Sequence, residues 1–198
     1  QAIGPDIKLA IDANQVWDVN NAINWINSLG DVNLHWVEEP TNPDDVVGHA
    51  AIAKAIAPVK VATGEHVTNR IIFKQMLQSK SLSFLQIDAS RVAGVNENIA
   101  IILMAAKYGI PVCPHAGGVG LCEMVQHLAM FDYVAVAGEH PDRVVEFVDH
   151  LHEHFVVPTD IRNARYMPPA KAGAGAQMFA QSVLDFTYPI GKEWIEAQ

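Results

Sequence analysis

The chain has 198 residues, is 50% hydrophobic, and carries 13 basic against 22 acidic side chains, for a formal net charge of −9. This composition is typical of a globular domain. The acidic balance and the absence of a basic run argue against nucleic-acid binding. The longest apolar stretch, residues 99–106, is far shorter than the roughly 18 residues of a membrane span, so we expect a cytosolic (cytoplasmic) protein without a membrane partner.

The first third of the chain repeats a unit in which a short apolar run is followed by an acidic residue and then by a helical pattern. The apolar runs predict buried parallel strands at residues 7–11, 34–37 and 59–62. Asp12, Glu38 and Glu65 follow these strands at nearly equal spacing. The carboxyl ends of parallel strands meet at one edge, where crowded carboxylates repel one another unless a divalent cation lies between them. Because oxygen ligands suit Mg²⁺, we predict that these three acids bind it.

The alternation of strands and helices continues toward the middle of the chain. Helices are predicted at residues 18–29, 43–56, 68–78, 96–108 and 120–131, and further strands at 84–88 and 111–115. Beyond residue 132 the pattern weakens: residues 133–137 and 143–148 are both expected to be extended, and only one of them need be the next strand.

This alternation indicates an α/β fold built from right-handed βαβ units. A complete (β/α)8 barrel takes roughly 250 residues, so we predict a partial TIM-type barrel at residues 1–165. Residues 166–198 are expected to form an extension, with a helix near 177–184, that packs on the barrel or on a part of the protein outside this chain. A doubly wound sheet is the alternative, although no Gly-rich phosphate loop follows a predicted strand.

Two further strand ends carry Asp88 and His115, in phase with the three acids. A carboxylate bonded to one ring nitrogen would fix the tautomer of His115 and raise its basicity. Singly, Asp88 as a turn cap and His115 as a core histidine are ordinary alternatives. Together they predict an acid/base pair.

Two other groups of residues suggest less. Cys113 and Cys122 form no C-x-x-C pattern and are interpreted as reduced, partly buried thiols. His150, His152 and His154 have a spacing that a zinc site could use, but we interpret them as a solvated polar segment.

The strand-end motifs resemble those of the enolase superfamily, in its mandelate-racemase-like branch. The matching segments are residues 11–15, 36–40, 63–65, 86–88 and 114–118. Within that branch, residues 95–98, 113–123, 148–155 and 166–169 resemble the L-fuconate dehydratases. The resemblance implies about strands 3 to 8 of the barrel, with the first strands and an N-terminal capping domain outside this chain.

The same resemblance implies roles for individual residues. Asp12, Glu38 and Glu65 would bind Mg²⁺, and Asp88 with His115 would transfer protons. Substrate contacts would come from Asn14, Trp36, Ala116, Gly117 and Glu146. Glu139 competes with Glu146 for the position of the acid on the last strand, and Glu39 is expected to stay outside the ligand set because neighbouring strand residues face opposite sides.

The implied reaction is dehydration of a sugar acid. The proton next to the carboxylate is removed, Mg²⁺ stabilises the negative charge that develops, and His115 protonates the departing 3-hydroxyl, which gives a 2-keto-3-deoxy acid. The family's partner base is a lysine in a Lys-x-Lys motif; this chain has none, so we expect that lysine before Gln1.

Two alternatives remain open. One is a racemase or epimerase of the same superfamily, and the other is a partial barrel without catalytic activity. We expect a small-molecule sugar acid as the partner, and either a homo-oligomer or association with the N-terminal part.

Overall fold

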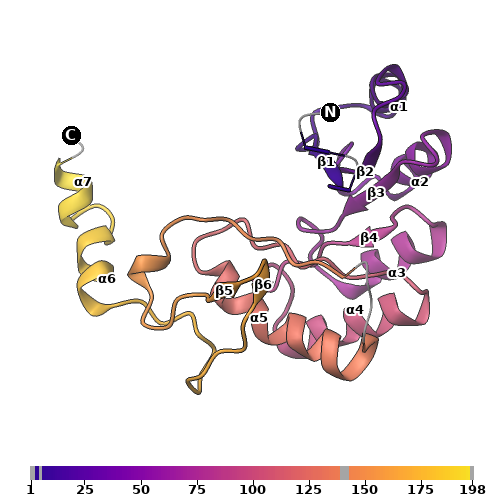
Figure 1. The fold of residues 1–198 in the computed structure, drawn as a ribbon. Coiled ribbons are helices and arrows are strands. Elements are labelled where there is room, and N and C mark those ends of the chain that lie inside the picture. The colour runs from indigo at the N-terminus through magenta and orange to yellow at the C-terminus, as the bar shows by residue number, and fades with distance from the viewer. Residues whose placement is uncertain (1–2, 5, 139–142, 197–198) are drawn as a thin grey trace.

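The computed structural model describes residues 3–4, 6–138 and 143–196 (Figure 1). Its centre is a four-stranded parallel sheet in the order β1-β2-β3-β4. The strands are β1 (Leu9–Asp12), β2 (Leu34–Glu38), β3 (Lys60–Thr63) and β4 (Phe84–Leu85). The helices that follow them are α1 (Val19–Ser28), α2 (Val46–Ala55), α3 (Arg70–Ser79) and α4 (Val95–Lys107). Figure 1 shows these helices along one side of the strands, as in a partial barrel.

Side-chain caps start the first three helices shortly after each strand. Asp18 accepts a hydrogen bond from the backbone amide of Asn21 at 2.8 Å, and Asn69 accepts from the backbone amides of Ile71 and Ile72 in α3. Such caps satisfy amides that have no partner inside the helix. The helices therefore begin where the chain must turn back to the next parallel strand.

Two apolar clusters fix the helices against the sheet. One joins α1 and α2 to β2 and β3 through Ile26, Val37 and Ile52, and the other includes Phe73 and Leu85 between α3 and β4. All five side chains are buried. Burial of these faces against the sheet is the main force that holds the repeated unit.

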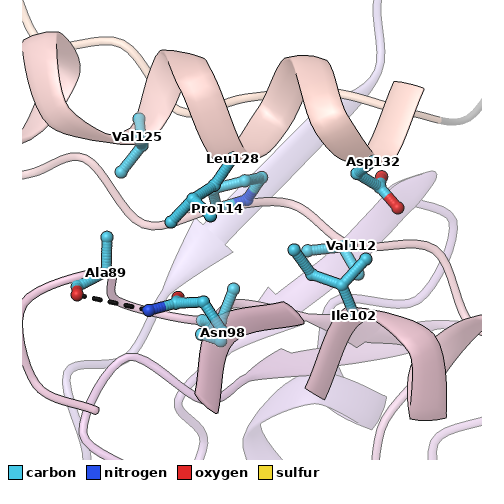
Figure 2. A pocket seen from close by; sticks show the side chains of 9 residues that line it. Ala89, Asn98, Ile102, Val112, Pro114, Val125, Leu128 and Asp132 are labelled. Atoms are coloured by element: carbon cyan, nitrogen blue, oxygen red, sulfur yellow. Dashed lines mark hydrogen bonds between the residues drawn. The ribbon is translucent and has the colours of Figure 1, made fainter. Parts of the chain in front are cut away.

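Residues 111–115 take the place of the next strand and are joined to residues 85–88 by backbone hydrogen bonds and two isolated bridges. Val112 is bridged to Leu85 and His115 to Asp88, both in the parallel sense. Figure 2 shows Val112 and Pro114 between side chains of α4 and α5 (Leu121–Phe131), where they line a cavity of about 10 Å³. Because Leu85 donates to Pro111, Cys113 to Leu85 and His115 to Ile87 through their backbone amides, this segment continues the parallel order of the barrel.

The prediction that residues 133–137 are extended is wrong. They belong to the π-helix η1 (Asp132–Ala137), which continues directly from α5. Asp132 has helical backbone angles, and its amide donates to the carbonyls of Leu128 and Ala129. A short apolar run suits a helix as well as a strand, so its periodicity alone does not decide between them.

The remaining elements are short. They are η2 (His152–His154), the antiparallel pair β5 (Ile161–Arg162) and β6 (Arg165–Tyr166), α6 (Ala180–Phe186) and α7 (Lys192–Glu196). α6 overlaps the predicted helix at 177–184, whereas α7 was not predicted. Phe179 donates its amide to the His154 carbonyl at 2.9 Å, so the extension contacts the segment after the barrel strands. A domain division at residue 165 stays a prediction.

Two general expectations can be compared with the structure. Cys113 and Cys122 are free, as predicted, and both are buried and not only partly so. No helix in the described part of the chain is long and apolar enough to cross a membrane.

Replacing Phe73 tests the α3 cluster. Phe73 is fully buried, so Phe73→Ala should lower the free energy of unfolding by about 3–5 kcal/mol. Ile71→Ala, in the same helix but 52% exposed, is the matched control and should cost about 1 kcal/mol or less. Urea unfolding followed by circular dichroism measures both, and equal losses would contradict this account of the core.

Candidate acid/base and metal site

The parallel register brings the first two predicted acids together at one edge of the sheet. Asp12 is paired with Glu38 across β1 and β2, and Glu38 with Ala62 across β2 and β3. Glu65 follows β3 after Gly64, whose φ is +139°. A Cβ on Gly64 would lie 2.9 Å from the Phe73 ring, so the turn that presents Glu65 needs glycine.

Glu38 lies in an environment that disfavours its charge. Burial raises its pKa to about 7, with further increases from Asp12 and Glu146, while hydrogen bonds from Gln86 and Trp36 act in the opposite direction. The Trp36 indole donates to Glu38 at 3.1 Å. A nearby cation would stabilise the ionised form of this carboxylate.

Among the described residues, the side chains that come close enough to share one metal ion are not the three predicted acids. Single donor atoms of Glu39, Glu65 and His66 lie within 4.8 Å of one another. His66 Nδ1 lies 2.7 Å from Glu39 Oε1 and 3.4 Å from Glu65 Oε1. Asp12 lies outside this set, and its Oδ1 accepts the amide of Asn14 at 2.8 Å. Of the predicted ligands, the structure thus brings only Glu65 into this set.

Glu39 enters the set because strand geometry ends at Glu38. Its φ is +42°, which turns the chain out of the alternating pattern, and its side chain is only 1% exposed. The side-chain amide of Gln15 donates to Glu39 Oε1 at 2.8 Å. Sequence reasoning missed Gln15 and His66, although each lies within three residues of a predicted ligand.

Asp88 and His115 form the predicted pair. His115 Nδ1 lies 2.8 Å from Asp88 Oδ2, while Asp88 Oδ1 accepts from the amide and hydroxyl of Ser90, each at 2.7 Å. Burial acts to raise the pKa of Asp88, but the bonds from His115 and Ser90 outweigh it and lower the pKa to about 2. Since Asp88 is ionised and can only accept, Nδ1 of His115 carries a hydrogen and donates a hydrogen bond to Asp88.

The other ring nitrogen of His115 faces the site. Nε2 lies 3.5 Å from Glu65 Oε2 and 3.8 Å from Glu146 Oε2. Burial lowers the pKa of His115, but the Asp88 hydrogen bond and the charges of Glu65 and Glu146 raise it above its usual value. The imidazole can therefore carry a proton at Nε2 near neutral pH.

The predicted substrate-contacting residues are distributed unevenly. The Ala116 amide donates to Glu146 Oε2 at 2.5 Å, so both lie beside the dyad. Trp36 and Glu146 line a cavity of about 290 Å³. Asn14 is exposed at the turn after β1. Glu139, the competitor of Glu146, lies outside the described residues.

Carboxylates and an Asp–His pair on successive ends of parallel strands define the class: part of an enzyme barrel of the TIM type. Residues 1–182 match the enolase C-terminal domain-like family, and the chain belongs to this family within the enolase superfamily.

Relatives agree with this assignment. The chain is 48% identical to an L-galactonate dehydratase of Hypocrea jecorina over 94% of its own length and 41% of that protein. It resembles the crystal structure of human mitochondrial enolase superfamily member 1 with 53% identity and a TM-score of 0.96, covering 98% of this chain and 45% of that one. A Salmonella typhimurium L-talarate/galactarate dehydratase liganded with Mg and L-lyxarohydroxamate matches with 31% identity and a TM-score of 0.76, covering 91% and 43%. The chain thus spans less than half of each relative.

Gly117 offers a test of the dyad's geometry that does not depend on turnover. A Cβ at this position would lie 2.8 Å from His115 Nε2, so Gly117→Ala should shield that nitrogen. We expect several-fold slower modification of His115 by diethyl pyrocarbonate, measured by peptide mass spectrometry. Val119→Ala, at a 53% exposed residue of the same loop, is the control. Equal rates in both variants would show that Gly117 does not border Nε2.

Proposed function

We propose that this chain supplies the metal-binding and proton-donating part of a Mg²⁺-dependent sugar-acid dehydratase. The Asp88–His115 pair carries the proposal, because its free nitrogen faces Glu65 and Glu146 at the edge where the carboxylates gather. The fungal and bacterial dehydratases among the relatives support the same reaction class.

Asp12, Glu38 and Glu65 are the proposed Mg²⁺ ligands. They offer three carboxylates from neighbouring strand ends, the donor type that Mg²⁺ prefers. Burial raises the pKa of Glu38 to about 7, and a bound cation would stabilise the ionised form of this carboxylate. Because these three side chains do not converge as Glu39, Glu65 and His66 do, binding would require rotation of Asp12 and Glu38. When bound, Mg²⁺ supplies positive charge for the negative charge that develops on the substrate carboxylate.

His115 is the proposed general acid for the departing 3-hydroxyl. Asp88 holds Nδ1, so the proton delivered to the substrate leaves from Nε2. The space beside Nε2 is bordered by Gly117, whose missing side chain leaves room for substrate. We assign substrate contacts to Asn14, Trp36, Ala116, Gly117 and Glu146.

L-Fuconate is the proposed substrate. It is the 6-deoxy form of L-galactonate, so both acids have the same configuration at the carbons where the proton and hydroxyl leave. The 48% identity to an L-galactonate dehydratase therefore supports an acid of this configuration. Removal of water gives the 2-keto-3-deoxy acid.

Turnover by the intact protein that contains this chain tests the reaction. With Mg²⁺ and L-fuconate, a 2-keto product should form, and His115→Asn should lower kcat by about 10²- to 10⁴-fold because general acid catalysis is lost. Titration calorimetry should find Mg²⁺ binding unchanged. His127→Asn, at an exposed position of α5, should keep normal turnover. A run in D₂O distinguishes the alternatives: deuterium at the α-carbon without keto product indicates a racemase, and neither signal indicates a silent barrel.

The choice between the two ligand sets is a separate prediction. Glu38→Gln should weaken Mg²⁺ binding by more than about 100-fold if Glu38 is a ligand, whereas His66→Asn should weaken it by about tenfold or less. Titration calorimetry on the same protein measures both. The reverse order would move the ion to the set formed by Glu39, Glu65 and His66.

A further inference from the structure

Glu146 lies on a segment that has few backbone bonds to the rest of the fold. Residues 143–149 are all described and form no strand. The Glu146 amide donates to the Pro114 carbonyl at 3.3 Å, and the Tyr166 hydroxyl donates to the Glu146 carbonyl at 2.5 Å. Since no ladder holds this segment, side-chain contacts must determine where Glu146 lies.

One end of the segment is held by an ion pair. Arg143 donates to Asp132 of η1, and both side chains are largely buried. A charge pair removed from water is costly to break, because either partner alone would leave an uncompensated charge. The start of the segment is thereby joined to the end of α5.

The other end is held by His152, through both ring nitrogens. Nδ1 lies 2.6 Å from Glu123 Oε1, and Nε2 lies 2.8 Å from the Val148 carbonyl oxygen. Glu123 is fully buried in the first turn of α5, and its Oε1 also accepts the Thr159 amide at 3.1 Å. A carbonyl and a carboxylate can only accept, so both nitrogens of His152 must donate, which requires the charged imidazolium.

The pKa values of His152 and Glu123 agree with a charged His152. Burial lowers the pKa of His152, but hydrogen bonds to Glu123 and Val148 raise it above its usual value. For Glu123, burial raises the pKa, while the bonds from His152 and Thr159 outweigh it. The His152 ring also stacks on Phe147, with 5.5 Å between ring centroids and 2° between planes. The interpretation of His152 as part of a solvated segment is therefore wrong.

We propose that His152 and Glu123 are positioning residues that hold Glu146 beside His115 and the Ala116 amide. His152 donates to the carbonyl of Val148, two residues after Glu146, and its ring stacks on Phe147. The hydrogen bond to Glu123 fixes His152 to α5. The inference rests on the proposed function in one respect, namely that Glu146 contacts substrate.

Hydrogen exchange measures the positioning without substrate. In the intact protein, His152→Gln should raise amide exchange in residues 143–149 by about tenfold relative to the wild type, while exchange in β1 to β3 stays the same. His150→Gln, an exposed residue two positions away, is the matched control and should change neither region. Unchanged exchange in residues 143–149 of His152→Gln would overturn the proposal. If that variant does not fold, Glu123→Gln, which keeps the size of the side chain, replaces it with the same criterion.

Kinetics separate positioning from a purely structural role. Displacement of a substrate-contacting group costs about 10- to 100-fold in kcat/KM, and both Glu146→Gln and His152→Gln should show such losses with L-fuconate. If His152 acts through Glu146, the double variant should lose little more than Glu146→Gln alone. Losses that multiply in the double variant would overturn the positioning role. A wild-type protein without dehydratase activity would refute the proposed function, while the exchange result would still decide whether His152 holds the segment.

Discussion

The parallel pairing of β1 to β4 is the constraint on which the site depends. Each helix returns the chain to the same end of the sheet, so every strand finishes at one edge. This arrangement gathers carboxylates at one edge, where Asp12 is exposed and Glu38 is partly buried. Burial, and to a smaller extent the charges of Asp12 and Glu146, raises the pKa of Glu38 to about 7. A cation at this edge would stabilise the ionised carboxylates and offset their mutual repulsion.

The second half of the site is held by different means. β4 has only two residues, residues 111–115 are joined to residues 85–87 by three backbone hydrogen bonds, and residues 143–149 form no strand. Side-chain hydrogen bonds add to this backbone pairing: Asp88 orients the His115 ring, and the Ala116 amide donates to the Glu146 carboxylate. Substitutions distant from the substrate can therefore act on the site through such contacts, whereas β1 to β3 are supported by an apolar core.

Sequence reasoning succeeded where the signal is local. The alternation of strands and helices through α4 and the Asp88–His115 pair follow from apolar runs and regular spacing, whereas the strand expected at residues 111–115 is present only as hydrogen bonds and isolated bridges to residues 85–88. It failed at residues 133–137, where a run of apolar residues fits a helix and a strand alike. It also failed at His152, whose partner Glu123 lies 29 residues away. No local sequence pattern at His152 or Glu123 predicts their contact, so the pair is visible only in the folded chain.

The turns after the strands matter as much as the strands themselves. Asp88 is one example: its Oδ1 accepts hydrogen bonds from Ser90 in the turn, which leaves Oδ2 to orient His115. Glu39 shows it differently, since a left-handed backbone takes its carboxylate out of the strand alternation and toward His66. Strand pairing thus decides which residues reach the edge, and the turns decide which atoms face one another there. In barrels of this type, loop variation after the strands lets one fold support many different reactions.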